Sequence, residues 1–203
     1  MRILHLSDTH GRHRELRGLP EADVVVHTGD FTGKGTVDEA ADFVAWFAAL
    51  PYRDKVFIGG NHDFCMAGGG CPCPLPTGVT YLCHTSVEIE GLRFYGVPMF
   101  RSSLDDTGYE SYYRLIPEGT GVLLTHQPPY GILDGGLYRG RPYRYGSRAL
   151  LDRVRRVAPR LHLFGHNHNV FGQCTVGSTL FVNGALAGHD CLLVRHPVVI
   201  EVP

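Results

Sequence analysis

The sequence predicts an α/β fold, and three features of the chain support that class. Short apolar segments alternate with an amphipathic segment through the first half, which is typical of strands that alternate with helices. Strand-like segments crowd the second half and indicate additional antiparallel strands. Polar clusters of Asp, His, Asn and Gly follow five of the apolar segments, where α/β sheets place their ligands.

The expected elements can be placed in chain order from these patterns. The helix at 36–50 begins with Thr36 and Glu39 in capping-box spacing and stops at Pro51. A second helix is expected at 147–157, and Glu90-Gly91 predicts a hairpin turn. Strands are expected at 3–6, 24–27, 55–58, 87–89, 92–95, 122–124, 161–164, 179–182, 192–195 and 198–202.

Two segments are expected to be irregular. The segment 65–78 contains three consecutive glycines and a Cys-Pro-Cys sequence, and 127–146 is rich in Gly, Pro, Tyr and Arg. Long loops in compact domains often form binding sites, so both segments are candidates for shaping one.

Length and composition indicate one globular domain over residues 1–203. Hydrophobic residues make up 43% and charged residues 19% of the chain, and the formal net charge is -1. A near-neutral chain lacks the overall field that favours a nucleic acid polymer. We find neither an apolar run long enough to span a membrane nor a signal-peptide pattern, so a cytoplasmic protein is expected.

Six cysteines and twelve histidines stand out in the composition. The chain is too long for a small disulfide-rich domain, so the cysteines are interpreted as free thiols in a reducing compartment. Cys71-Pro72-Cys73 is interpreted as incidental to a surface loop rather than as a redox pair or a metal site. Seven histidines lie outside the polar clusters and are interpreted as structural: His5, His13, His27, His84, His162, His189 and His196.

Five polar clusters at strand ends carry the chemistry. They are Asp8-Thr9-His10, Gly29-Asp30, Gly60-Asn61-His62-Asp63, Thr125-His126 and Gly165-His166-Asn167-His168. Taken singly, each has a plain structural explanation as a turn, a helix cap or a hydrogen-bonded histidine. Five in succession are better explained by one shared site.

The clusters together offer two carboxylates, four imidazoles and one amide as metal ligands, with His62 in addition. Seven ligands are too many for one ion and suit two. Two cations about 3.5–4 Å apart can hold both the attacking and the leaving oxygen of a phosphoryl displacement. Imidazole and carboxylate ligands without thiolate suit Mn, Fe or Zn, and the sequence leaves the choice among them open.

In order, the five clusters resemble the motifs of the calcineurin-like metallophosphoesterases: D-x-H, G-D, G-N-H-[D/E], H and G-H-x-H. Flanking segments are similar to those of the small metallophosphoesterase-domain phosphodiesterases. These segments are 7–11, 29–32, 94–98, 124–129, 131–134 and 197–203.

The resemblance implies a four-layer α/β/β/α sandwich with two metal ions at one edge. One ion would be held by Asp8, His10, Asp30 and His168, and the other by Asp30, Asn61, His126 and His166. His62 resembles the catalytic histidine that contacts the phosphate and protonates the leaving oxygen. Asp63 follows His62 directly and is expected to steady the site.

Two departures from the family pattern concern the loops. Gln127 stands where the subgroup usually has glycine, and the segment 65–78 has no counterpart that we can match. The arginine-rich segment 138–156 is either a solvated surface or a substrate contact. Its candidate substrate-binding residues are Arg139, Arg141 and Arg144.

The expected function is hydrolysis of small phosphodiesters, cyclic nucleotides among them by analogy with the subgroup, through attack by a metal-bridging hydroxide. A phosphomonoesterase is the alternative, because the arginines could read the extra charge of a terminal phosphate. A non-catalytic scaffold of the same fold is a third alternative. The expected partner is a small phosphoester, with neither membrane nor nucleic acid polymer, and no oligomeric state is predicted.

Overall fold

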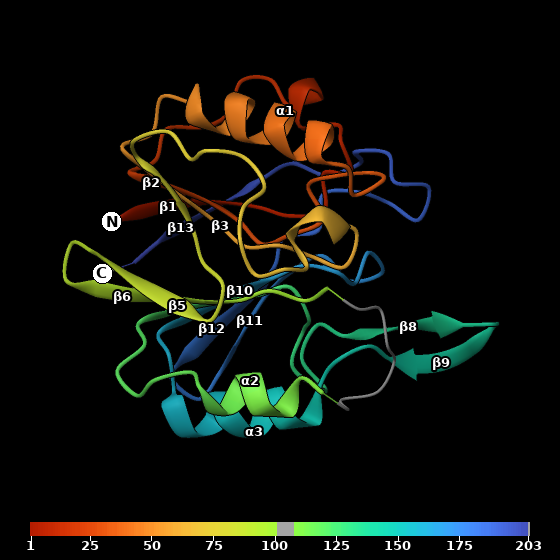
Figure 1. Ribbon diagram of the computed structural model, residues 1–203. Coiled ribbons are helices and arrows are strands. Elements are labelled where there is room, and N and C mark those ends of the chain that lie inside the picture. The colour runs from red at the N-terminus through yellow and green to blue at the C-terminus, as the bar shows by residue number, and fades with distance from the viewer. Residues whose placement is uncertain (101–107, 203) are drawn as a thin grey trace.

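Two β-sheets pack face to face between layers of helices in the computed structural model, which describes residues 1–100 and 108–202 (Figure 1). From top to bottom in Figure 1 the layers are α1, the first sheet, the second sheet, and α2 with α3. This arrangement confirms the expected α/β/β/α sandwich.

The first sheet has five strands in the order β13-β1-β2-β3-β4. β1 to β4 are parallel and β13 pairs antiparallel with β1. Every residue of β2 is buried, because helices cover one face of the sheet and the second sheet covers the other. The strands are β1 (Arg2–Leu6), β2 (Val24–His27), β3 (Asp54–Phe57), β4 (Val79–Tyr81) and β13 (Val198–Glu201).

The second sheet has six strands in the order β11-β12-β10-β7-β6-β5. The four inner strands are parallel, and the edge strands β11 and β5 are antiparallel to their neighbours. The predicted hairpin turn joins β5 to β6. The strands are β5 (Thr85–Ile89), β6 (Leu92–Val97), β7 (Val122–Thr125), β10 (Leu161–Phe164), β11 (Gly172–Val176) and β12 (Thr179–Asn183).

Helix α1 (Val37–Ala48) covers the first sheet and begins with the predicted capping box, in which Thr36 and Glu39 satisfy each other's backbone N–H groups. Phe43 stacks on Phe31, in the loop after β2, with ring centroids 4.2 Å apart, and it contacts Phe57 of β3, which anchors α1 to the sheet. The outer face of the second sheet is covered by α2 (Glu110–Arg114) and α3 (Arg148–Val157). Two 3-10 turns, η1 (His13–Glu15) and η2 (Phe64–Met66), complete the helical elements of the described residues.

Two predictions about secondary structure were wrong. The segment 127–146 is not wholly irregular, because β8 (Gly135–Tyr138) and β9 (Arg141–Arg144) form a hairpin that projects from one end of the sandwich (Figure 1). The segment 192–195 is not a strand. There Leu192 and Val194 are exposed, while Arg195 donates to backbone carbonyls of the preceding loop.

A search of the described residues finds no helix that combines the length and the apolar character needed to cross a membrane.

Candidate metal centre

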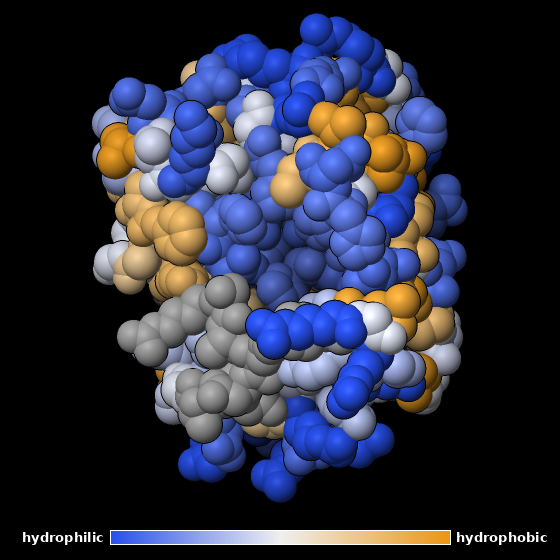
Figure 2. Space-filling model, turned by 90° about the vertical axis from the view of Figure 1, so that its right-hand side faces the viewer, coloured by the Kyte–Doolittle hydropathy of each residue, from blue (hydrophilic) through white to orange (hydrophobic). Residues whose placement is uncertain are grey.

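The five polar clusters meet at one edge of the sandwich. They follow the carboxyl ends of β1, β2, β3, β7 and β10, which lie side by side within the two sheets. Figure 2 shows this face, where hydrophilic residues line a hollow with a volume of about 270 Å³. The expected ligands that line it are His10, Asp30, Asn61, His166 and His168.

Four of the expected ligands have a left-handed backbone. Asp8, His10, Asp30 and His166 have φ angles of 55°, 43°, 55° and 64°. Such angles are uncommon outside glycine and are found chiefly where the surrounding structure enforces them, often at functional sites. The sharp turns bring side chains from different strands toward one point.

Two glycines leave space for the carboxylates. A Cβ atom at Gly60 would overlap Asp30 Oδ1, and one at Gly165 would overlap Asp8 Oδ2. The glycines of the G-N-H and G-H-x-H sequences therefore allow the backbone to approach the carboxylates closely.

One group of donors surrounds Asp8. Its Oδ1 lies 3.1 Å from His168 Nε2, and His168 Nε2 lies 3.3 Å from His10 Nε2. These three side chains present ligand atoms that all lie within 4.8 Å of one another. Asp8 is completely buried, so its charge requires a nearby positive partner.

A second group surrounds Asn61. Its Oδ1 lies 3.0 Å from His126 Nε2 and 2.7 Å from His166 Nδ1. The amide and both imidazoles thus point to a common position.

Asp30 lies between the two groups. Its Oδ2 is 3.3 Å from His126 Nε2 on one side and 4.0 Å from His10 Nε2 on the other. The ligand atoms of Asp8, Asp30 and His126 also lie within 4.8 Å of one another. A single carboxylate therefore faces donors of both groups.

Backbone carbonyls fix the orientation of two imidazoles. His126 Nδ1 donates to the carbonyl of Thr28 at 2.8 Å, and His168 Nδ1 donates to the carbonyl of Gly188 at 2.8 Å. Because a carbonyl only accepts, each Nδ1 carries the proton, and each Nε2 can offer a lone pair to a metal ion.

The pKa values show that the site attracts positive charge. Burial alone would raise the pKa values of Asp8 and Asp30, but neighbouring histidines lower both. Burial would lower the pKa of His126, but the charges of Asp30 and Asp8 raise it to about 9. Burial lowers the pKa of His166 to about 4. Both carboxylates are therefore ionised, next to imidazoles of which His166 stays neutral.

The donor set fits divalent cations. His10 Nε2 and His168 Nε2 face each other, and only one proton could lie between them, whereas a cation could accept both lone pairs. Nitrogen and oxygen donors without thiolate suit Mn, Fe or Zn. The residues present are therefore compatible with such ions.

His62 and Asp63 occupy different environments. His62 lines the hollow, and its ring meets the ring of His10 edge-on with centroids 4.8 Å apart. Asp63 is completely buried and accepts hydrogen bonds from the backbone N–H groups of Gly60, Asp30 and Thr32 and from the Thr32 hydroxyl. Asp63 thus connects the loops after β2 and β3.

The three arginines expected to contact substrate lie on the β8–β9 hairpin. Arg139 is in its turn, and Arg141 and Arg144 are in β9. Arg144 Nη1 lies 2.7 Å from the buried carboxylate of Asp134, which also accepts from two backbone N–H groups at the base of the hairpin. Among the described residues that line the hollow, the hairpin segment contributes Tyr145 and none of these arginines.

Three other residues that line the hollow are not identified by the sequence patterns: Asn169, His189 and Cys191. Tyr145 also lines the hollow and lies in the segment 138–156, which is expected to be either a solvated surface or a substrate contact. From the sequence alone, His189 is interpreted as structural. His189 follows Gly188, whose carbonyl accepts a hydrogen bond from His168 Nδ1. This contact joins segments that are distant in the sequence, so no sequence pattern predicts it. Only Asn169 has a usable signal, since it directly follows His168.

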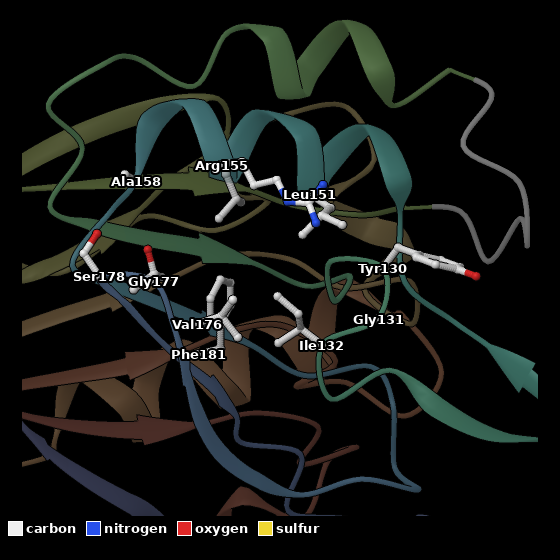
Figure 3. A pocket seen from close by; sticks show the side chains of 12 residues that line it. Tyr130, Gly131, Ile132, Leu151, Arg155, Ala158, Val176, Gly177, Ser178 and Phe181 are labelled. Atoms are coloured by element: carbon white, nitrogen blue, oxygen red, sulfur yellow. The ribbon is translucent and has the colours of Figure 1, made fainter.

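The most voluminous pocket described lies elsewhere. It measures about 540 Å³ and runs between α3 and the turn of the β11–β12 hairpin (Figure 3). Its walls are mostly apolar, with Ile132, Leu151 and Phe181 among them. The described residues that line it include no expected metal ligand, so the chemistry belongs to the smaller hydrophilic hollow.

A four-layer sandwich with carboxylates and imidazoles gathered at the strand ends defines the class of metal-dependent hydrolases of phosphoric esters. Comparison with known families agrees. The chain belongs to the calcineurin-like phosphoesterase family, whose model matches residues 1–170.

Two similar proteins align with the whole chain. Metallophosphoesterase domain-containing protein 1 of Homo sapiens is 34% identical over 235 residues, covering 100% of this chain and 71% of that protein. A UPF0046 protein of Caenorhabditis elegans is 33% identical over 228 residues, covering 100% of this chain and 81% of its own.

Solved structures share the fold at low sequence identity. One crystal structure superposes with a TM-score of 0.67 at 14% identity, covering 90% of this chain and 89% of the other. The TT1561 protein of Thermus thermophilus gives a TM-score of 0.53 at 12% identity, covering 92% of this chain and 91% of its own. These similarities support the architecture alone.

Proposed function

We propose that this metal-dependent phosphoesterase hydrolyses small phosphodiesters with two metal ions. The observation that carries the proposal is the position of Asp30 between two groups of converging donors. In this proposal the first ion is held by Asp8, His10, Asp30 and His168. The second is held by Asp30, Asn61, His126 and His166.

When bound, two such ions neutralise charge on the transferring phosphoryl group and lower the pKa of a water molecule toward neutrality. The chain contributes two ionised carboxylates to the ligands, Asp8 and Asp30. Two divalent ions exceed their charge, so the centre keeps a net attraction for an anionic phosphodiester. We propose manganese as the ion for assays.

His62 is the proposed general acid. It lines the hollow beside His10, and its backbone N–H donates to Asp30 Oδ1 at 2.8 Å. Its imidazolium would give a proton to the leaving alkoxide, a step that typically contributes about 10²–10⁴-fold to the rate. Asp63 would support this step by holding the loop that carries His62.

Substrate specificity is proposed to come from the β8–β9 hairpin. Tyr145 presents its ring to the hollow, with centroid 6.4 Å from that of His166. Arg139 and Arg141 are exposed on the hairpin and would contact parts of the substrate beyond the phosphate. A hollow of about 270 Å³ matches a small ligand, such as a cyclic nucleotide.

The ratio of diester to monoester hydrolysis tests the proposal. We expect bis-(p-nitrophenyl) phosphate to be cleaved faster than p-nitrophenyl phosphate in Mn²⁺. Faster monoester cleavage would instead identify a phosphatase. Absence of cleavage with two ions bound would favour a non-catalytic scaffold.

We also propose that residues 1–203 form one domain and that the protein is cytoplasmic. All six cysteines are free thiols, which supports a reducing compartment.

A further inference from the structure

Three completely buried histidines lie behind the candidate metal centre, and the proposed reaction does not use them. Each forms a hydrogen bond with a threonine that lies within two residues of an expected ligand in the chain. The pairs are His5 Nε2 with Thr28 Oγ1 at 2.9 Å, His27 Nε2 with Thr9 Oγ1 at 3.1 Å, and His162 Nε2 with Thr125 Oγ1 at 2.9 Å.

These histidines are neutral, and stability alone does not explain why they occupy buried positions. Burial lowers the pKa of His5, His27 and His162 to about 3 in each case. His5 Nδ1 and His162 Nδ1 have no hydrogen-bond partner in the described part of the chain. An imidazole in an apolar interior is less stabilising than an aliphatic side chain of similar size, so another role is indicated.

The hydrogen bond between His5 and Thr28 is connected to an expected metal ligand, His126. Thr28 accepts a hydrogen bond from His126 Nδ1 through its carbonyl while its hydroxyl is bonded to His5. The connection runs from β1 to the end of β2 in the first sheet, and on to the end of β7 in the second sheet. It ends at His126 Nε2, which faces Asn61 and Asp30.

Close packing holds the His5 ring in this position. A Cβ atom at Gly184 would lie 2.6 Å from His5 Cε1 and Nδ1, so only glycine is accommodated there. The backbone after β12 therefore rests on the imidazole and limits its movement.

We propose that His5 is a positioning residue for the second metal ion. Through Thr28 it holds His126 in the orientation and tautomer that direct Nε2 at the ion. This inference rests on the proposed function, because it requires His126 to be a ligand. Groups that hydrogen-bond directly to a metal-binding histidine typically change metal affinity by about 10–100-fold when they are removed. His5 acts one hydrogen bond further away, through Thr28.

The test is Mn²⁺ binding by the full chain, measured by titration calorimetry, together with the free energy of unfolding in chelator. His5→Leu removes the hydrogen bond and keeps an apolar side chain. We expect one of two Mn²⁺ affinities to fall by about 10-fold, the lower end of the range for direct partners, while the metal-free unfolding free energy stays the same or rises. A purely structural role predicts a loss of stability with both affinities unchanged, and that result would overturn the proposal.

Thr28→Val offers a second variant with a smaller change, since it removes only the hydroxyl and keeps the carbonyl that holds His126. We expect it to weaken the same Mn²⁺ site. The matched control is Thr179→Val. Thr179 is buried at the start of β12, and its hydroxyl donates to the carbonyl of Pro159. The control should leave both affinities unchanged.

The outcomes also separate this inference from the proposed function. Unchanged affinities in both variants, with two ions bound to the natural chain, contradict the positioning role alone. No Mn²⁺ bound by the natural chain contradicts both.

Discussion

His62 donates its backbone N–H to Asp30 Oδ1 at 2.8 Å. The other oxygen of Asp30 faces His126 and His10, at 3.3 and 4.0 Å. The proposed general acid and the proposed bridging ligand are therefore joined by one hydrogen bond. Metal binding and placement of the acid depend on the same carboxylate.

Replacing His62 should separate chemistry from metal binding. For His62→Ala we expect kcat for a diester with an alkoxide leaving group, such as a cyclic nucleotide, to fall by about 10²–10⁴-fold, because the alkoxide loses its proton donor. Hydrolysis of bis-(p-nitrophenyl) phosphate should fall much less, because its nitrophenolate leaves without protonation. Calorimetric Mn²⁺ affinities should not change. The control is His196→Ala, an exposed histidine that should keep full activity. A His62 variant with normal kcat for the diester with the alkoxide leaving group would exclude this residue as the acid.

Asp63 should matter mainly through the loops that it connects. Asp63→Asn keeps the shape but turns an N–H₂ group toward backbone N–H donors, leaving some of them unsatisfied. We expect the unfolding free energy to drop by about 2–4 kcal/mol in urea titrations with chelator. Asp190→Asn, at an exposed position, serves as the comparison. Equal stability of the two variants would disprove the connecting role.

The buried histidines predict how stability depends on pH. Burial lowers the pKa of His162 to about 3, below the value near 6.5 of an unfolded chain. The unfolded state therefore binds a proton that the folded state does not between those values. The contribution of each such histidine to the free energy of unfolding is fully present above pH 6.5. It declines by about 1.4 kcal/mol per pH unit as the pH falls below that value.

His162→Leu removes one of these groups. In chelator, its unfolding free energy should fall less steeply between pH 6 and pH 4, by about 1.4 kcal/mol per pH unit relative to the natural chain. Urea titrations at several pH values measure this slope. An unchanged slope would mean that His162 is protonated in the folded protein.

Two arginines of the β8–β9 hairpin should behave differently. Arg144 pairs with the buried Asp134, so Arg144→Ala should lower the melting temperature measured by calorimetry. Arg141 is exposed, and Arg141→Ala should raise KM for the diester a few-fold without changing the melting temperature. If Arg141→Ala leaves KM unchanged, Arg141 does not contact this substrate.

The site could be predicted from the sequence more completely than the loops could. Ligands at strand ends could be predicted because Asp8, Asp30 and His126 each follow a short apolar segment. The capping box at Thr36 is likewise local. The four-layer arrangement came from the resemblance to a family rather than from periodicity.

Features that depend on tertiary contacts could not be predicted. Val37 is the first apolar residue at helical spacing in the segment 36–50, yet it is 50% exposed, and the helix packs through Phe43 and its neighbours. The role proposed for His5 depends on Thr28, which lies 23 positions away. Pairing of β8 with β9 depends on a turn that places Arg139 at a φ of 51°, an unusual angle for arginine.

Hydrolysis of bis-(p-nitrophenyl) phosphate during stepwise addition of Mn²⁺ to the metal-free chain tests the central claim most directly. Two ions at one shared carboxylate predict that activity rises as the second equivalent binds and disappears with chelator. Full activity with a single bound ion, or activity that persists in chelator, would contradict a two-metal centre at Asp30.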